Sequence, residues 1–357
     1  MRFLHLFKSS SITTSPKLIK QIIKDIMEID IEYLKSPTFL IIGEKSSHYN
    51  FLANSNVDYL FLLNDKELFE YLSNEKSTRI IIHGLPVKNI FKQLYLSKID
   101  LRSVSWINWG HGHVYGKRKL LSYWLDRFIL SKFNKVIALT LEDLKIIQKS
   151  FPKANSYFLP YKSSQIEHAL NKDLPVKANI GMHIMVGVSG GKPQNHIKGF
   201  RALANLNLED CTVFSPINYN NDDKDYLHTV KKEGFDLFGK KFNPIEVLLN
   251  RDEYENFLST IDVLILPSYK QNGLFNIYLL LFMGKKVFVP KNSNLYNSLK
   301  NLGFVIEALE EISIEKVNSS YDINTVKLNR RVMFELYNRN KKLEEWAWFY
   351  RTLYNME

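Results

Sequence analysis

The sequence is poor in cysteine and has no long apolar run. Its 357 residues include one cysteine, Cys211, which excludes an intramolecular disulfide, offers no cysteine metal cluster and suits a reducing compartment. The longest apolar run, residues 274–283, contains Asn276 and is about half of the roughly 20 residues that a membrane-spanning helix needs. The amino-terminal apolar segment is short and is interrupted by His5 and Lys8, so we expect a first β-strand there and no signal peptide. These absences predict a cytoplasmic protein without a transmembrane helix.

Two common phosphate-binding motifs are also missing. The stretch "VGVSGGKPQNHIKGF", residues 186–200, places glycines between a strand-like run and a helical pattern, as phosphate-binding turns do. A P-loop requires Ser or Thr after Gly191-Lys192, where Pro193 stands, and the dinucleotide pattern GxGxxG cannot be fitted to the stretch. What remains is a Gly/Ser turn followed by polar side chains suited to an anion: Lys192, Asn195, His196 and Lys198. An ordinary strand-to-helix connection is the alternative on local grounds.

Basic residues outnumber acidic ones. The formal net charge of +11 indicates an anionic partner, which could be nucleic acid, an anionic lipid or a phosphorylated substrate. The composition, 24% charged and 45% hydrophobic, is that of a globular protein, and the length allows two domains with full cores.

Short apolar runs alternate with amphipathic stretches, which predicts parallel sheets with βαβ crossovers. In the first half we expect strands at 2–7, 39–42, 59–63, 79–82, 104–108 and 135–139, with helices between them such as 16–28. In the second half we expect strands at 183–186, 212–215, 236–238, 263–266 and 286–289, with helices from 195 and at 222–233, 251–259 and 276–283. The pattern breaks near Pro160, where we place the domain boundary.

The expected architecture is therefore α/β, with two Rossmann-like domains in tandem. We place the first domain at 1–165, a linker at 166–180, the second domain at 181–335 and a terminal helix at 336–357. That helix ends "EEWAWFYRTLYN", and so many aromatic side chains must be buried against something. We expect it to pack back on the N-terminal domain; a membrane-facing surface is the alternative.

Ligands of open parallel sheets bind beyond the carboxyl ends of the strands. In the first domain these ends carry His83-Gly84 and the stretch "WGHGH" at 109–113. His83, His111 or His113 could deprotonate an acceptor hydroxyl, because imidazole titrates near neutral pH. Histidines satisfied by local contacts are one alternative, and a metal site, which would require His83 to lie near the other two, is another.

The second domain offers three segments at the same kind of position. They are residues 187–196, 216–219 and 267–273. The last one runs into a helix whose first N–H groups can hold a phosphate or ribose oxygen, and Lys270 adds a positive charge beside it.

A basic segment at 116–135 carries an apolar stripe at helical spacing with cations on its flanks. One interpretation is docking to an anionic membrane surface, and the other is a core-facing helix with a solvated face. The membrane interpretation uses Lys117, Arg118, Lys119, Trp124, Arg127 and Phe128.

These residues resemble those of a known family, the glycosyltransferases of the GT-B type. More narrowly, the sequence resembles the TDP-Fuc4NAc:lipid II Fuc4NAc transferases of enterobacterial common antigen synthesis, glycosyltransferase family 56. The resemblance spans most of the chain in order, although each motif is short. It is carried by "HG" at 83, Trp109-Gly110, "VGVSGGKPQNH", "SPINYNNDDKDYL" and "QNG" at 271 entering "LFMGKKVFVP".

The resemblance implies two facing Rossmann-like domains, the second holding a nucleotide-sugar donor and the first a lipid-linked acceptor. It implies transfer of a deoxyamino sugar from TDP or UDP to a glycan on a polyprenyl diphosphate, by an enzyme peripheral to the cytoplasmic membrane. Contacts to the donor diphosphate would come from Gly187, Ser189, Gly190, Asn195 and His196, with Lys192 and Lys198 neutralising charge. Pro216, Tyr219 and Glu246 would lie near the nucleotide, and Lys270, Gln271, Asn272 and Gly273 near the ribose or donor sugar.

The sequence departs from the wider group in one respect. Many retaining GT-B enzymes carry two glutamates eight positions apart, where this chain has Gln271 and Leu279. The resemblance implies no divalent metal and no other cofactor. A non-catalytic nucleotide-sugar-binding or assembly protein with the same fold is the first alternative, and a nucleic-acid-binding protein is a weaker one because the cations are spread along the chain.

Overall fold

The structure, a computed structural model, forms two compact units. The N-terminal unit comprises Met1–Ser164 with Arg339–Glu357, and the C-terminal unit comprises Gln165–Asn338. The structure describes residues 2–9, 15–30, 34, 37–43, 45, 47–55, 57–75, 78–85, 88–109, 120–161, 166, 181–219, 221–269 and 273–355.

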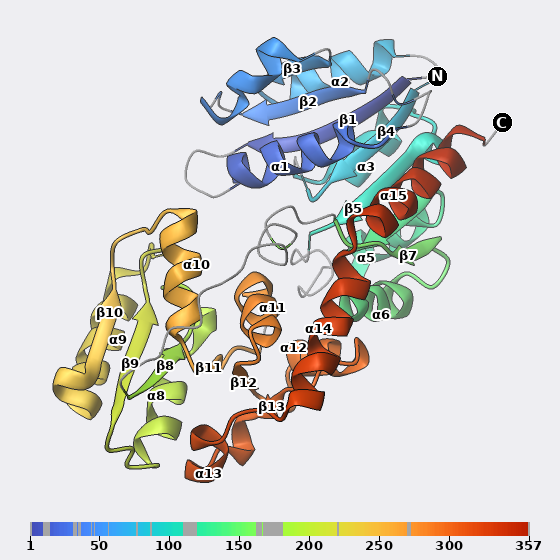
Figure 1. Cartoon of the computed structure of the whole chain (residues 1–357). Coiled ribbons are helices and arrows are strands. Elements are labelled where there is room, and N and C mark those ends of the chain that lie inside the picture. The colour runs from blue at the N-terminus through green and yellow to red at the C-terminus, as the bar shows by residue number, and fades with distance from the viewer. Residues whose placement is uncertain are drawn as a thin grey trace. The chain divides into compact units, whose positions relative to one another are not determined.

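A seven-stranded parallel sheet forms the N-terminal unit, in the order β3-β2-β1-β4-β5-β6-β7 (Figure 1). Its strands are β1 (Arg2–Ser9), β2 (Thr38–Gly43), β3 (Asp58–Leu62), β4 (Thr78–His83), β5 (Val104–Asn108), β6 (Lys135–Ala138) and β7 (Ser156–Phe158). Its helices are α1 (Ser15–Met27), η2 (Ser47–Asn54), α2 (Asp65–Asn74), α3 (Ile90–Leu96), η3 (Leu101–Ser103), α5 (Leu120–Leu130), α6 (Leu141–Ser150) and α15 (Arg339–Tyr354).

Side chains that alternate along β1 fill a core on each face of this sheet. Leu4 and Leu6 join the core that α2, α3, α5 and α6 cover, whereas Phe3 and Phe7 join the core that α1 and α15 cover. This is the period of two that a strand imposes on its side chains. Helices therefore cover both faces, as a parallel sheet requires.

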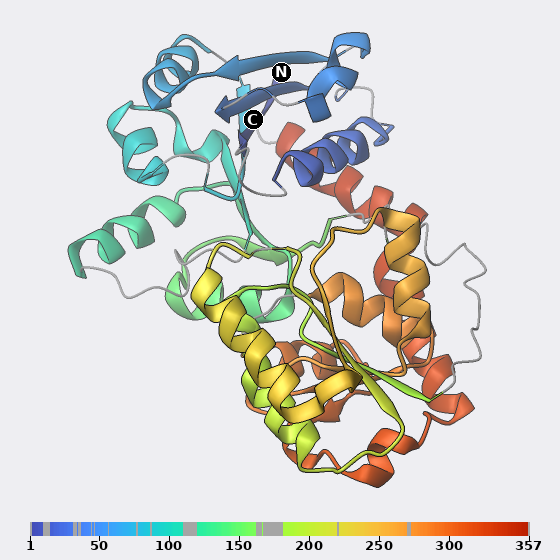
Figure 2. The same cartoon turned by 90° about the vertical axis from the view of Figure 1, so that its left-hand side faces the viewer.

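The terminal helix α15 packs back on the N-terminal unit. The ring of Tyr350 is buried and meets Phe3 edge to face, with 5.4 Å between the ring centroids. Arg79 Nε of β4 donates to the carbonyl of Leu353 at 2.8 Å. Figures 1 and 2 both show α15 beside α1, and the expected packing of this helix is confirmed.

A six-stranded parallel sheet forms the C-terminal unit, in the order β10-β9-β8-β11-β12-β13. Its strands are β8 (Met182–Val186), β9 (Cys211–Pro216), β10 (Phe242–Ile245), β11 (Val263–Ile265), β12 (Lys286–Val289) and β13 (Glu307–Ala308). Its helices are η4 (Lys192–Gln194), α8 (His196–Ala204), α9 (Lys224–Phe238), η5 (Gly239–Lys241), α10 (Arg251–Thr260), α11 (Leu274–Phe282), α12 (Asn294–Asn301), η6 (Leu309–Glu311), α13 (Ile314–Asn318) and α14 (Ile323–Tyr337). Figure 2 shows α8 and α9 side by side on one face of the sheet.

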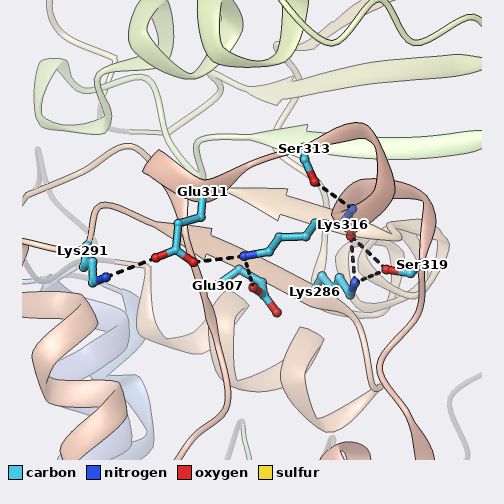
Figure 3. A network of polar contacts seen from close by, with 7 residues as sticks. All are labelled: Lys286, Lys291, Glu307, Glu311, Ser313, Lys316 and Ser319. Carbon is cyan, nitrogen blue, oxygen red and sulfur yellow. Dashed lines mark hydrogen bonds and ion pairs between the residues drawn. The ribbon is translucent and has the colours of Figure 1, made fainter.

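Buried and exposed charges together hold α13 against the edge of this sheet. Lys286 begins β12 and is 6% exposed; its Nζ donates to the carbonyl of Lys316 at 2.7 Å and to Ser319 Oγ at 2.6 Å. Burial lowers the pKa of Lys286. Figure 3 shows the whole network, made by Lys286, Lys291, Glu307, Glu311, Ser313, Lys316 and Ser319.

Most expected strands and helices are present, but one strand is wrong. Residues 236–238, expected as a strand, form the last turn of α9, which ends at Gly239 with a φ of +53°. The strand that pairs with β9 at this edge of the sheet is β10 instead, and its Phe242 side chain is buried. The expected linker at 166–180 lies outside the described residues apart from Ile166. Among the described helices, none combines the length and the apolar character that a bilayer crossing demands.

Candidate functional site

The C-terminal unit has a switch in strand order between β8 and β11. From β8 the chain adds β9 and β10 on one side and then crosses to β11 on the other. Such a switch leaves a crevice at the carboxyl ends of the two central strands, where α/β proteins bind ligands. Here α8 follows β8 and α11 follows β11, so the first turns of both helices lie at this edge.

The loop after β8, residues 187–191, packs closely against both helices. Gly187 has a φ of +74°, and a Cβ there would lie 2.6 Å from His196 Cδ2. Gly273, the residue before α11, has a φ of +69°, and a Cβ there would lie 2.7 Å from Val188 Cγ2. Only glycine fits these two positions without strain, and the contacts join α8, the loop and α11 into one structure.

Hydrogen bonds fix the loop but leave part of its backbone unpaired. The N–H of Val188 donates to Gln194 Oε1 at 3.0 Å, and the N–H of Gly190 donates to the carbonyl of Tyr219 at 2.7 Å. Within the described part of the chain, the N–H groups of Ser189 and Gly191 have no acceptor. Two backbone donors are thus available to an anion at this edge.

The two helices at the switch point also lack side-chain caps. Asn195 before α8 has a φ of +55° and Gly273 precedes α11; neither caps its helix with a side chain. By contrast, side chains cap five other helices of this unit, namely α9, α10, α12, α13 and α14. In α8 the first N–H groups are partly occupied, because the Lys198 N–H donates to the carbonyl of Asn195. The uncapped first turn of α11 carries unpaired N–H groups within the described part of the chain, and both helices present the positive end of their dipole, which favours a bound anion.

His196, expected to touch the donor, lies beneath the loop instead of at its surface. Its side chain is fully buried (0% exposed), and its backbone N–H donates to the Tyr226 hydroxyl oxygen at 3.2 Å. The Tyr226 hydroxyl lies 3.1 Å from His196 Nδ1 and is hydrogen-bonded to it, and His196 Nε2 faces Gly187. Burial lowers the pKa of His196 to about 4. The ring is therefore neutral at pH 7 and supports the backbone of Gly187.

Two lysines bring positive charge to this edge, and each has an acidic neighbour. Lys192 Nζ lies 2.6 Å from Asp223 Oδ2, the N-cap of α9, and this hydrogen bond raises the pKa of Lys192. Lys198 Nζ donates to the Tyr269 hydroxyl at 2.7 Å and lies 3.8 Å from Glu310 Oε1. Tyr269 lies in the expected segment 267–273 and Asp223 in the motif "SPINYNNDDKDYL", although neither was named as a site residue; Glu310 was not expected, since nothing in its spacing relates it to the glycine loop.

The loops after β9 and β10 adjoin the glycine loop. Pro216 ends β9 and is buried, whereas Tyr219 in the following loop is 43% exposed. The Asn218 side-chain amide donates to the carbonyl of Val247 at 2.6 Å, which ties the two loops together. Val247 and Leu248 are 73% and 63% exposed, and they give this edge an apolar surface. Glu246 lies in the same loop and pairs with Lys231 of α9 at 3.1 Å.

The structure brings five of the fourteen expected donor-binding residues together. Gly187, Ser189, Gly190, Tyr219 and Gly273 lie around one loop. Lys270, Gln271 and Asn272 lie outside the described residues.

In the N-terminal unit, His83 lies at the corresponding switch between β1 and β4, and it is 1% exposed. Its Nδ1 is 2.6 Å from the Tyr161 hydroxyl, and its Nε2 is 2.9 Å from His5 Nδ1. The Trp109 indole N–H also donates to the Tyr161 oxygen, at 2.9 Å. Both ring nitrogens of His83 are thus occupied, and the ring stacks on Phe7 with 4.1 Å between centroids.

These contacts set the direction of a buried hydrogen-bond chain. If Tyr161 donates to His83 and His83 Nε2–H donates to His5, only the His5 Nε2–H lacks a partner within the described part. The opposite direction would leave both the Tyr161 proton and a His5 lone pair unpaired, which costs more. Burial lowers the pKa of His83 well below its usual range and that of His5 to about 3. His111 and His113, the other two expected acid/base candidates, lie outside the described residues.

Of the residues expected at a membrane surface, Trp124, Arg127 and Phe128 lie on α5, and Lys117, Arg118 and Lys119 lie outside the described residues. Trp124 and Phe128 are 55% and 47% exposed. The inner face of α5, with Ile129 and Leu130, is buried in the core. In the described ranges, no three His, Cys, Asp or Glu side chains come together as metal ligands.

Solved structures with this architecture are glycosyltransferases and related sugar-phosphate proteins. A glycosyltransferase from Rickettsia africae superposes with a TM-score of 0.72 at 14% identity, over 100% of this chain and 99% of that one. Sucrose-phosphate synthase from Thermosynechococcus elongatus superposes with a TM-score of 0.65 at 13% identity, over 99% of each chain. Anabaena HepE in complex with UDP and glucose superposes with a TM-score of 0.64 at 11% identity, over 98% of this chain and 99% of that one. The fold is GT-B, with two Rossmann-like units.

The family follows from the sequence as a whole. The model of glycosyltransferase group 56, the 4-α-L-fucosyltransferases, matches residues 1–337. The chain belongs to this family and is a glycosyltransferase that uses a nucleotide-sugar donor and a glycan acceptor. The resemblance drawn from the short motifs is confirmed.

Proposed function

We propose that the chain transfers a deoxyamino sugar from TDP or UDP to a glycan carried on a polyprenyl diphosphate, and that the glycine loop of the C-terminal unit holds the donor diphosphate. The observation that carries the second part is the pair of uncapped helices, α8 and α11, at the switch point of the sheet. The N–H groups of Ser189 and Gly191 and the first turn of α11 offer backbone donors to the phosphate oxygens, and α8 adds the positive end of its dipole.

The same donors suit the reaction as well as binding. Sugar transfer breaks the bond between the anomeric carbon and the β-phosphate oxygen, so negative charge develops on the departing diphosphate. Fixed N–H groups and the lysines Lys192 and Lys198 stabilise that charge without reorganising. This arrangement needs no divalent metal, and we expect EDTA to leave turnover unchanged.

The nucleoside would occupy the adjoining loops. The exposed side chains of Tyr219, Val247 and Leu248 provide an apolar surface on which a pyrimidine base can pack. Glu246 lies in the same loop and could accept a hydrogen bond from ribose or base. The hydrogen bond between Asn218 and Val247 keeps this surface next to the glycine loop.

We place the acceptor-side acid/base on His111 or His113. His83 is buried, and its low pKa and two hydrogen bonds make it a poor partner for an acceptor hydroxyl. It serves better as a positioning residue, since it orients Tyr161, which in turn binds the indole of Trp109. The acceptor's lipid keeps it in the cytoplasmic membrane, so we place the enzyme on the inner face of that membrane.

A turnover assay tests the proposal. Purified protein is incubated with TDP- or UDP-linked 4-amino-4,6-dideoxy sugars and a short-chain polyprenyl diphosphate glycan, and nucleoside diphosphate release and acceptor mass are measured together. We expect release coupled to an acceptor heavier by one sugar. A donor that binds and is never cleaved would favour the non-catalytic alternative.

A further inference from the structure

Two helices of the N-terminal unit, α3 and α5, present exposed aromatic and aliphatic side chains on one surface. Trp124 and Phe128 stand one turn apart on α5, and Tyr95 of α3 meets Phe128 edge to face with 5.9 Å between ring centroids. Leu96 follows Tyr95 and is 63% exposed. We call Tyr95, Leu96, Trp124 and Phe128 the α3/α5 patch.

Cations surround the patch. The Arg127 guanidinium lies 4.9 Å from the centroid of the Trp124 ring, and Lys132 Nζ lies 5.6 Å from that of Phe128. Lys92 stands one turn before Leu96 on α3, so it lies on the same side of that helix. Lys88 and Lys98, just outside α3, are also exposed.

The charge of this surface is of one sign. In residues 88–98 and 122–135 the acidic residue is Asp126, which is only 8% exposed. Within the described part of the chain, none of the side chains of Lys88, Lys92, Lys98, Arg127 and Lys132 pairs with a carboxylate. Unpaired cations around exposed aromatic rings are typical of segments that lie in the interface of an anionic bilayer.

We propose that the α3/α5 patch docks the enzyme on an anionic lipid bilayer, with the four apolar side chains among the headgroups and the cations on anionic lipids. This inference rests on the proposed function, whose acceptor is lipid-linked. A second copy of the chain fits less well, because the same cations would face one another across a self-contact.

The position of the helices suits this role. α3 follows β4 and α5 follows β5, so both helices begin at the carboxyl edge of the N-terminal sheet. Ligands of such sheets bind at that edge. Trp124 lies in the middle of α5, whereas Leu96 ends α3 and Phe128 lies in the last turn of α5, so the patch extends along the helices away from that edge. Docking through the patch therefore places this side of the N-terminal unit, and not the carboxyl edge alone, against the membrane that contains the acceptor.

Vesicle sedimentation of the full chain tests the inference. Wild-type protein should bind vesicles of phosphatidylcholine with about one third phosphatidylglycerol, and bind phosphatidylcholine alone more weakly. We expect Trp124→Ser/Phe128→Ser to lower the partition coefficient at least about tenfold, and Lys92→Gln to lower it about fivefold on the anionic vesicles. Trp348→Ser is the matched control, because Trp348 is 43% exposed with Lys135 over its ring but belongs to α15, on the other face of the sheet.

Each outcome has a distinct meaning. The inference would be overturned if wild type and the double variant bind the anionic vesicles equally, or if wild type does not bind them. If wild type forms dimers and the double variant does not, a second copy of the chain is the occupant instead. Transfer to the short-chain acceptor without vesicles should be retained by the double variant. If that transfer fails even in wild type while vesicle binding holds, the proposed function fails and the docking surface stands.

Discussion

The contact between Gly187 and His196 allows a sharp test of how the glycine loop is built. A Cβ at position 187 would overlap the His196 ring, which is fully buried and has no room to move. Gly187→Ala therefore carries two costs. The left-handed backbone costs about 1–2 kcal/mol in an L-residue, and overpacking a buried ring costs about a further 1–3 kcal/mol.

Gly239→Ala separates these two costs. Gly239 also has a positive φ, +53°, but no atom lies within 4 Å of its added Cβ. Because its ψ is −126°, outside the left-handed helical region, we expect this control to lower the free energy of unfolding by about 1–3 kcal/mol and to leave nucleotide affinity unchanged. Urea denaturation gives the first quantity and calorimetric titration with TDP or UDP gives the second.

In Gly187→Ala the loop can escape the overlap only by moving away from α8. We expect this shift to weaken diphosphate binding roughly tenfold or more, since each 1.4 kcal/mol of rearrangement corresponds to a factor of ten. Adding His196→Ala removes the ring, so the double variant should cost less than the sum of the singles. Equal losses of nucleotide affinity in Gly187→Ala and Gly239→Ala, or additive effects in the double variant, would refute the reasoning.

Three further predictions concern charge. Asp223→Asn keeps the cap of α9 but releases Lys192, so we expect a severalfold gain in TDP or UDP affinity by calorimetry; a loss would contradict a role for Lys192 at the diphosphate. Burial lowers the pKa of His5 to about 3, so unfolding takes up a proton below the ordinary pKa of 6.5, and His5 alone should lower the free energy of unfolding by about 2 kcal/mol between pH 7 and pH 5. His83 and His196, whose pKa burial also lowers, add to this fall, and urea midpoints that do not change with pH would count against it. Lys286→Met removes the buried donor to the Lys316 carbonyl and should lower the free energy of unfolding by about 1–3 kcal/mol, and an unchanged melting curve would show the contact to be dispensable.

The sheets were predictable from the sequence because parallel strands are buried on both faces. Runs such as 104–108 and 286–289 are mostly apolar and match β5 and β12 to the residue, and every residue in both strands is buried. The strand expected at 236–238 fails because Phe235 and Leu237 resemble a strand locally, although both are half exposed on a helix. The real strand, β10, contains Pro244 and the polar Asn243, and its place is decided by pairing with β9.

The glycine loop was predictable from the sequence as a candidate site, but the positions of its side chains were only partly so. Glycines after a strand indicate a close approach of backbone and ligand, and the structure places Gly187 and Gly190 in such a loop. The sequence could not tell whether His196 points to the ligand or to the core, because burial depends on Tyr226, thirty residues away. The sequence also could not tell whether Tyr95 of the α3/α5 patch is exposed or buried, because a helix of seven residues is too short for its periodicity to separate the two faces.

The most direct test of the central claim compares nucleoside diphosphates with monophosphates. Calorimetric titration of the wild-type protein with TDP, TMP, UDP and UMP measures what the β-phosphate adds to binding. The account predicts that one pyrimidine diphosphate binds at least about tenfold more tightly than its monophosphate, and that this ratio falls toward one in Gly187→Ala but not in Gly239→Ala. Equal affinities for mono- and diphosphate in wild type, or a ratio that Gly187→Ala leaves intact, would show that the glycine loop does not hold the donor diphosphate.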